Sequence, residues 1–392
     1  MSRNISVGID LGSSTTRVVV GEFLKGESTP KIIGAGESPT EGIRHGYVVN
    51  VEEAAASVRK AVALAEKTSG EKIKRAFVAL SGNTLKSEVC TGVSIITMAS
   101  GEVTALDANK ALEECEENLN LNNKKIIQVV PLSYRLDGKE VEGRLEGLKG
   151  NKVEVKALFV TYSVLHLEDL LTVLAEAGVE TIDVVPSGVA GSLVALSDRQ
   201  KIAGGALVDI GAEKVSIFVF ENGLLSSVHT FSLGGADITN DIALGFKIPL
   251  EEAEQLKLGE IGNLPAQTGN SKKKLDEIIE ARLSDIFELI ENHLKKIKRS
   301  GLLPAGIVFV GGGSSVSRLE ELSKYILKLP ASHGTTELFG NIKTKLRDPS
   351  WFITLGLVIS GRGIDTYHQG SFRGLLKDLK NTIKSSIKQL MP

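Results

Sequence analysis

Residues 5–20 read ISVGIDLGSSTTRVVV, and residues 206–220 read ALVDIGAEKVSIFVF. Each stretch contains a run of apolar and β-branched residues, a short turn and a second such run, which predicts a β-hairpin. An aspartate, Asp10 or Asp209, lies in each first run, two positions before a glycine. Because one unit returns about 200 residues later among further strand and helix patterns, the sequence predicts a duplicated α/β fold with two related halves.

The turns of the two hairpins have the composition of phosphate-binding loops. A phosphate group needs N–H donors directed at it, and glycine and serine allow the backbone to approach it closely. A carboxylate repels phosphate, so the two aspartates are expected to hold Mg²⁺ through water molecules. A single turn of this kind is equally consistent with a hairpin that binds no ligand. The nucleotide-binding residues predicted in these turns are Asp10, Gly12, Ser13, Ser14, Thr15, Asp209, Gly211 and Ala212.

A third glycine-rich turn follows a short apolar strand pattern at 307–310. It contains Gly311, Gly312 and Gly313, and a helix is expected to begin at Val316. This context suits contact with adenosine or with a phosphate, because glycine lets the backbone lie against a flat base. Three such turns in this order predict a site for ATP and Mg²⁺, although no residue is identified as a catalytic base.

Two neighbouring segments extend the predicted site. Gly234 and Gly235 precede a helical pattern and offer more N–H groups to the phosphates. Glu254 and Lys257 lie three positions apart on one face of the next helical segment. They are expected either to contact a ribose or to form a solvated ion pair.

The bulk composition excludes several classes of protein. The net charge of −2 over 392 residues gives no reason to expect nucleic acid as a partner. The two cysteines imply no disulfide framework and fit a reducing cytoplasm. No signal peptide is recognised, and no stretch approaches the roughly 20 apolar residues that span a bilayer. The six histidines are scattered, so no metal site beyond Mg²⁺ is predicted.

The segment from 82 to 162 differs in texture from the rest, since short strand patterns surround one helix expected at 105–119. It predicts a small α+β module inserted into the first half. With the hairpins and the third turn, the chain resembles the actin, heat-shock chaperone and sugar-kinase superfamily, and within it the FtsA family of bacterial cell-division proteins. The residues that carry the resemblance to that family are ALSGN at 79–83, CTGV at 90–93, GEVTALD at 101–107, VPLSYRLDG at 130–138, RLE at 144–146, LGG at 233–235 and ITNDIA at 238–243.

The resemblance implies an actin-like, two-lobed fold of duplicated mixed-sheet subdomains, with an SHS2-like inserted module and a C-terminal amphipathic helix. Two connecting helices, at 185–196 and 349–361, are expected at the hinge. The implied parts are a first lobe at 1–82, 163–197 and 349–366; the module at 83–162; a second, nucleotide-binding lobe at 198–244 and 300–348; an upper subdomain with a partner surface at 245–299; and a membrane-targeting helix at 370–392.

Residues 370–392 read GSFRGLLKDLKNTIKSSIKQLMP. Apolar residues recur every three or four positions, and basic residues gather on a neighbouring face, which is typical of a helix lying in the surface of an anionic membrane. The alternative is a helix packed on its own protein or on a partner. The predicted membrane-binding residues are Phe372, Arg373, Leu375, Leu376, Lys377, Leu379, Lys380, Ile383, Lys384, Ile387, Lys388 and Leu390.

Partners are implied chiefly by the family resemblance. Lys274 and Arg282 lie eight positions apart, close to one face of a helix expected at 272–298. In the family, equivalent basic residues receive the acidic C-terminal tail of the tubulin-like protein FtsZ; the alternative is a pair of solvated helix charges. The resemblance also implies polymerisation, contacts of the module with other division proteins, and a location on the cytoplasmic face of the cell membrane at the division site.

The second phosphate turn departs from the family pattern, which has more glycine and a threonine where this chain has Ala212, Glu213 and Lys214. Glu213 would repel a phosphate unless it points away, and Lys214 would compensate in part. The prediction is therefore ATP binding with at most weak hydrolysis, in a membrane-bound adaptor that tethers FtsZ filaments. Two alternatives remain: a small-molecule kinase or phosphatase of the same superfamily, and a PilM-like scaffold of a pilus system.

Overall fold

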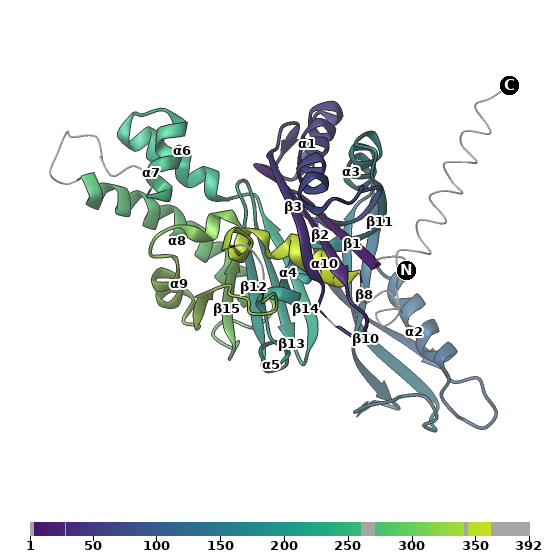
Figure 1. Ribbon diagram of the computed structural model, residues 1–392. Helices are drawn as coiled ribbons and strands as arrows, with labels where there is room; N and C mark the ends of the chain where they lie inside the picture. The colour runs from purple at the N-terminus through teal and green to yellow at the C-terminus, as the bar shows by residue number, and fades with distance from the viewer. Residues whose placement is uncertain (1–3, 28, 260–270, 341–343, 362–392) are drawn as a thin grey trace.

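Two five-stranded sheets with the same strand order form the centre of the molecule (Figure 1). The computed structural model describes residues 4–27, 29–259, 271–340 and 344–361. The first sheet has the order β11-β6-β1-β2-β3, and the second has the equivalent order β16-β15-β12-β13-β14. In each sheet three consecutive strands form an antiparallel meander, and two later strands add in parallel beside the first. The predicted duplication is confirmed, since each of the two hairpins begins one sheet.

The first lobe contains the first sheet, with α1 packed on β2 and β3 and with α3 beside α1. Helix α1 begins after Asn50, whose side chain accepts hydrogen bonds from the N–H groups of Glu52 and Glu53, and it ends where Gly70 is left-handed with φ of 73°. The elements of this lobe are β1 (Asn4–Leu11), β2 (Thr15–Phe23), β3 (Lys31–Pro39), β4 (Ile43–Arg44), β5 (Tyr47–Val48), α1 (Val51–Ser69), β6 (Arg75–Leu80), α3 (Val164–Glu176) and β11 (Glu180–Pro186).

The second lobe contains the second sheet and a group of helices, of which α6, α7 and α8 form the far end (Figure 1). Its apolar core joins that sheet to these helices and to α9. The elements of this lobe are α5 (Asp198–Ala203), β12 (Gly205–Ile210), β13 (Val215–Glu221), β14 (Leu224–Phe231), α6 (Gly235–Phe246), α7 (Leu250–Leu258), α8 (Ser271–Lys296), β15 (Gly306–Val310), η1 (Gly312–Ser315), α9 (Leu319–Leu327), β16 (Ala331–His333), η2 (Thr344–Arg347) and η3 (Pro349–Trp351).

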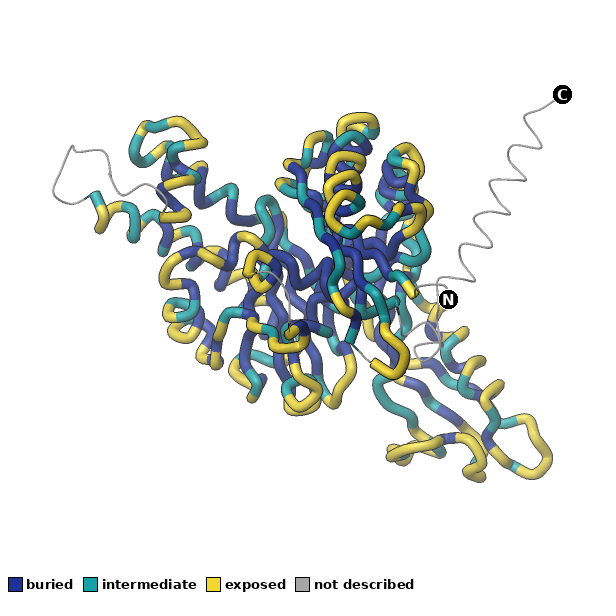
Figure 2. The backbone as a smooth tube through the Cα atoms, viewed as in Figure 1, coloured by how far each residue is buried: buried dark blue, intermediate teal, exposed yellow. Residues whose placement is uncertain are grey.

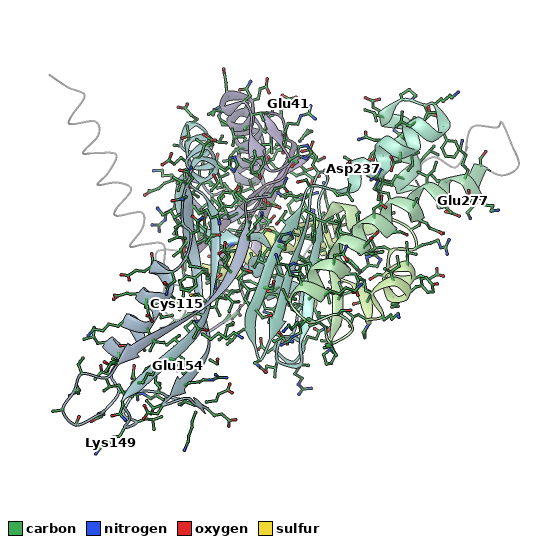
Figure 3. The ribbon with its side chains drawn as sticks, turned by 180° about the vertical axis from the view of Figure 1, so that it is seen from behind. Glu41, Cys115, Lys149, Glu154, Asp237 and Glu277 are labelled. Carbon is green, nitrogen blue, oxygen red and sulfur yellow. The ribbon has the colours of Figure 1, made fainter. Side chains whose placement is uncertain are left out.

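The inserted module projects from the body and has a small core of its own (Figure 2). Its sheet has the order β7-β10-β8-β9 and packs against helix α2, in which Cys115 is buried (Figure 3). Strand β10 continues past this core, and Leu158, Val160 and Tyr162 join the core of the first lobe. The elements of the module are β7 (Lys86–Ile95), α2 (Ala105–Glu117), β8 (Lys124–Leu136), β9 (Lys139–Val141) and β10 (Lys152–Ser163).

Two helices cross between the lobes: α4 (Ser187–Ala195) and α10 (Phe352–Ser360). Helix α4 follows the first sheet in the chain but also packs on the second, whereas α10 follows the second lobe and packs on β1, β2 and β6. The crossing is close, since a Cβ on Gly356 would lie 1.9 Å from the carbonyl oxygen of Ala190. The helices predicted at 185–196 and 349–361 are confirmed, and they connect the two lobes through one packed contact.

One predicted boundary is wrong. The helix expected from Val316 begins only at Leu319, because Gly312–Ser315 form a 3₁₀ turn and Val316 is extended with φ of −68° and ψ of 138°. The N–H and the hydroxyl of Ser314 both donate to the carbonyl oxygen of Gly311, which closes that turn. The whole tail at 370–392, with its predicted membrane-binding residues, lies outside the described residues.

Candidate functional site

A cavity of about 950 Å³ lies between the two lobes. It is lined by the turn after β1, the turn after β12 and the turn after β15, which are far apart in the chain. Glu41 of the first lobe also lines it, and Figure 3 labels this residue together with Asp237 at the start of α6 on the second lobe. All the residues predicted to bind nucleotide line this one cavity, with the exception of Gly234.

The first phosphate turn, Gly12–Thr15, is tightly folded. A Cβ on Gly12 would lie 2.8 Å from the carbonyl oxygen of Thr15, so a larger residue there would displace the backbone. The hydroxyl of Ser13 accepts a hydrogen bond from the N–H of Gly46 at 3.1 Å, which holds the turn to the β4–β5 hairpin of the same lobe. The Ser13 side chain is therefore held within the first lobe, while the residues of the turn line the cavity.

The second phosphate turn is held by the glycine pair that precedes α6. The N–H of Gly235 donates to the carbonyl oxygen of Gly211 at 2.9 Å, and the N–H of Ala236 donates to that of Ala212 at 2.7 Å. Gly234 lies directly against this turn, since a Cβ on it would be 2.4 Å from the carbonyl oxygen of Ala212. Gly234 thus supports the wall of the cavity from behind, whereas Gly235 lines it.

The backbone of the third turn, at Gly311, lies close to the side chain of Asp209. Gly311 has φ of 87°, and a Cβ on it would lie 2.3 Å from Oδ1 of Asp209, so both the backbone angle and the space require glycine. Gly312 also lines the cavity, and a Cβ on it would meet nothing within 4 Å. The backbone at Gly312 is therefore open to a flat ligand.

The charges at the floor of the cavity are buried. Asp10 and Asp209 are 8% and 5% exposed, and burial raises the pKa of both carboxyl groups, to about 7 for Asp209. The nearby cations Lys214 and Arg17 act in the opposite direction on the pKa of both carboxyl groups. Burial likewise lowers the pKa of Lys214, which the two aspartates oppose. The site therefore holds two acids whose charged form would be stabilised by a further cation.

Lys257 does not belong to a solvated ion pair. It is buried, and its ammonium donates to the carbonyl oxygen of Gly235 at 3.1 Å and to the hydroxyl of Thr239 at 2.9 Å. It also pairs with Glu254 at 2.7 Å, and Glu254 accepts a hydrogen bond from Thr239. This network joins α7 to the start of α6, and the side chain of Glu254 remains 45% exposed beside the cavity.

Several lining residues were not predicted from the sequence: Arg17, Thr40, Glu41, Gly42, Ile43, Arg44, Val49, Glu53, Ser81, Glu213, Lys214, Ala236, Leu258, Ser350 and Ile353. Seven of these fifteen come from the β3–β5 region and from the end of β6, which carry no glycine-rich motif. The position of Ser81 follows from the strand order, because β6 lies beside β1 in the first sheet. No spacing in the sequence indicates it.

Comparison with known proteins gives the family. Residues 206–356 match the family model described as Cell division protein FtsA, and residues 82–161 match the model described as SHS2 domain inserted in FTSA. A Cell division protein FtsA of Bacillus subtilis (strain 168) is 30% identical over 375 residues, which are 91% of this chain and 83% of that protein. The chain belongs to the FtsA family. It is therefore a member of a cell-division family, and the resemblance seen in the sequence is confirmed.

Solved structures confirm the actin-like fold of this FtsA-family chain. A PilM-PilN type IV pilus biogenesis complex has a TM-score of 0.68 at 19% identity, covering 91% of this chain and 98% of the other. MreB 5 of Spiroplasma citri bound to AMPPNP has a TM-score of 0.52 at 13% identity, covering 96% and 98%. At such identities the likeness concerns the fold alone. The family match therefore decides in favour of the cell-division family over the pilus and kinase alternatives.

The two basic residues predicted to receive a peptide lie outside the cavity, on α8. Nε and Nη2 of Arg282 donate to the two carboxylate oxygens of Asp241 at 2.7 and 3.1 Å, and its side chain is 27% exposed. The ammonium of Lys274 donates to the carbonyl oxygen of Gly245 and lies 5.0 Å from the ring of Phe246. Both cations are thus already bound to residues of α6. Within the described residues, no helix is both long and apolar enough to cross a membrane.

Proposed function

We propose that this FtsA-family protein binds ATP with Mg²⁺ in the cavity between its lobes. The observation that carries the proposal is that three glycine-rich turns from distant parts of the chain line one cavity of about 950 Å³. That volume lies within the roughly 300–1,000 Å³ typical of small-molecule sites. The ligand class is supported by MreB 5, a protein of the same fold bound to AMPPNP, which is an analogue of ATP.

Each part of the cavity suits one part of the nucleotide. Backbone N–H groups of the first and second turns would hold the phosphates. The open backbone at Gly312 would lie against the adenosine, and the exposed carboxylate of Glu254 would accept hydrogen bonds from ribose hydroxyls. Asp10 and Asp209 would hold Mg²⁺ through water, since Mg²⁺ binds proteins through few carboxylates and retains water and phosphate ligands. When bound, that ion neutralises phosphate charge.

The test is the affinity for a fluorescent ATP analogue in the presence of Mg²⁺. Asp10→Ala and Asp209→Ala should each weaken binding at least about tenfold, because each removes a carboxylate that holds the ion. Asp198→Ala is the matched control, since Asp198 is exposed at the start of α5 and does not line the cavity. Unchanged affinity in both cavity variants would show that the assignment is wrong.

The proposed role of the nucleotide-bound protein is that of an adaptor in cell division. It would polymerise on the cytoplasmic face of the cell membrane at the division site and tether FtsZ filaments there, with other division proteins contacting the inserted module. Membership of a cell-division family and the actin-like fold support this role. The lysine-rich amphipathic pattern at 370–392 supports the membrane attachment.

The acidic tail of FtsZ would bind at Lys274 and Arg282. A peptide carboxylate would have to share or displace the carboxylate of Asp241, which now pairs with Arg282. Arg282→Ala or Lys274→Ala should therefore weaken binding of a tail peptide about fivefold or more, and Asp241→Asn should strengthen it. Lys295→Ala, about 20 Å from Arg282 along the same helix, is the control. If Arg282→Ala, Lys274→Ala and Asp241→Asn all leave the affinity for the peptide unchanged, the assignment of this site is wrong.

Membrane attachment is tested by co-sedimentation with vesicles that contain anionic phospholipid. The full chain should sediment with these vesicles and release at high salt, because lysine contacts with lipid charge are screened. Deletion of 370–392 should abolish sedimentation, and replacement of Lys377, Lys380, Lys384 and Lys388 by Gln should reduce it. Equal sedimentation of the deleted chain would contradict a tether in this segment.

A further inference from the structure

Glu213 and Lys214, the two charged residues of the second phosphate turn, form hydrogen bonds with residues of the first lobe. The ammonium of Lys214 donates a hydrogen bond to the hydroxyl of Ser81, 133 positions away in the chain. Lys214 is only 5% exposed. It fits beside Gly46, where φ is 79° and a Cβ would lie 3.1 Å from its Nζ. This lysine is therefore packed between the lobes rather than extended into solvent.

Glu213 faces away from the turn that carries it. Its carboxylate accepts a hydrogen bond from the N–H of His45 at 2.6 Å and pairs with Arg44 at 3.6 Å. The next residue, Gly46, donates its N–H to Ser13 of the first phosphate turn. The β4–β5 hairpin is thus held by both phosphate turns. With Glu213 so engaged, Lys214 is the charged side chain of this turn that is available to a phosphate.

Ser81 is the point at which the inserted module leaves the first lobe and returns to it. The family model for the module begins at residue 82 and ends at residue 161. The hydroxyl of Tyr162, on the returning strand, donates to the carbonyl oxygen of Ser81 at 3.0 Å. Gly82, in the turn between β6 and β7, has φ of 143°, and a Cβ on it would lie 3.0 Å from that same hydroxyl. Lys214 therefore binds the residue on which both junctions of the module converge.

We propose that Lys214 is a phosphate-binding residue that exchanges Ser81 for the nucleotide, and so links occupancy of the cavity to the junction of the inserted module. The inference rests on the proposed binding of ATP. It follows from the strength of the two partners, because a hydrogen bond from an ammonium to a phosphate is stronger than one to a neutral hydroxyl. Lys214 already lines the cavity that would hold the phosphates.

Because of this exchange, nucleotide binding would affect the junction of the module, and a change at that junction would affect nucleotide binding. Without nucleotide Lys214 joins the second lobe to Ser81, and with nucleotide bound Ser81 would lose that contact. By thermodynamic linkage, a partner of the module that shifts Ser81 would change the affinity for nucleotide by the same factor. The module would thus report the nucleotide state of the cavity to whatever binds it.

The experiment is a double-mutant cycle on the full chain, with Lys214→Met, Ser81→Ala and both together, read by affinity for Mg-ATP. Lys214→Met should weaken binding about tenfold or more, because it removes a charged donor. Ser81→Ala should strengthen binding by a few-fold, because Lys214 loses its competing partner, and it should have no effect when Lys214 is Met. Lys201→Met is the control. Lys214→Thr, which introduces the threonine of the family pattern, serves if Lys214→Met does not fold.

Hydrogen exchange of backbone amides supplies the second reading. ATP should increase exchange around residues 80–86 and 160–164 in the unmodified chain and leave it unchanged in Lys214→Met. If Ser81→Ala changes the affinity for Mg-ATP equally in the unmodified chain and in Lys214→Met, the inference is wrong. It is also wrong if Lys214→Met and Lys214→Thr both bind Mg-ATP with full affinity. In either case the proposed binding of ATP would still stand. If the unmodified chain itself binds no Mg-ATP, the proposed function fails, and this inference fails with it.

Discussion

The two phosphate turns occupy equivalent positions in sheets of equal strand order, yet their side chains do different things. In the first turn Ser13 bonds within its own lobe, to Gly46. In the second, Glu213 and Lys214 bond to the opposite lobe, at His45 and at Ser81. The strand order is repeated because both cores require it, whereas the turn residues contribute little to either core and have diverged. Comparison of the halves therefore separates residues that build the fold from residues that operate between its lobes.

The largest loss of folding stability is expected from a substitution at the crossing of α4 and α10, the contact through which these helices connect the two lobes. Gly356→Ala would bring a Cβ to 1.9 Å from the carbonyl oxygen of Ala190, so the helices must separate. We expect a loss of about 3 kcal/mol or more in the free energy of unfolding, measured in urea. Gly191→Ala is the control, because its nearest neighbours are side-chain atoms at 3.2 and 3.4 Å, and it should cost under about 1 kcal/mol. Equal losses would show that the crossing is not the shared support.

A histidine pair found in the second lobe should make the stability of the protein depend on pH. His293 stacks on His229 in the second lobe with ring centroids 4.8 Å apart, and burial lowers the pKa of His293 to about 4. Between pH 6.5 and 4 the unfolded chain therefore binds the proton more readily, so stability should fall as pH falls through this window, by about 1–3 kcal/mol.

Urea unfolding at pH 7 and pH 5 measures this loss, and His293→Gln should remove most of it. The exposed His45→Gln serves as the control, since it should retain the loss. An unchanged pH dependence in His293→Gln would show that other groups produce it.

The turns themselves should respond unequally to the same substitution. A Cβ on Gly12 would lie 2.8 Å from the carbonyl oxygen of Thr15, but one on Gly211 would lie 3.2 Å from that of Lys214. Gly12→Ala is expected to cost about 1–2 kcal/mol of folding free energy and Gly211→Ala less than half of that. Thermal unfolding of the two variants side by side provides the measurement, and a reversed order would contradict the tighter first turn.

The smallest effects concern the outer part of the contact between the lobes. The side chain of Arg44 is 75% exposed, so its ion pair with Glu213 is screened by water. Arg44→Ala should change the free energy of unfolding by less than about 0.5 kcal/mol. Glu213→Ala should cost about 1 kcal/mol, because the N–H of His45 loses its acceptor. A larger effect for Arg44 than for Glu213 would reverse this assignment.

Local signals were sufficient for much of the fold. The helix predicted at 105–119 is observed as α2, Ala105–Glu117. The duplicated hairpins predict the two sheets, and the residues predicted to bind nucleotide make up about half of those that line the cavity. In contrast, the start of α9 was missed, since the 3₁₀ turn at Gly312–Ser315 is held by hydrogen bonds of Ser314 rather than by a capping residue.

Contacts between distant residues were out of reach. Ser81 has no feature that relates it to Lys214, because their contact depends on how the two lobes meet. The same holds for Arg282, which the family resemblance implies as a partner of peptide carboxylates and which is paired with Asp241 of α6. Periodicity and turn composition describe one segment at a time, so they do not indicate which charges will neutralise one another across a fold.

Strand β10 has a mechanical consequence. Its twelve residues, Lys152–Ser163, run unbroken from the tip of the inserted module into the first lobe, paired on both sides by β7 and β8 (Figure 1). At about 3.3 Å per residue the strand is about 40 Å long, and its register with β8 shifts at Lys156/Ala157 and at Val160/Thr161. A sideways pull at the outer end therefore acts as a torque on Tyr162 at the inner end, with the whole module as its lever arm. Because the hydroxyl of Tyr162 donates to the carbonyl oxygen of Ser81, which lines the cavity, that torque would act at the edge of the cavity.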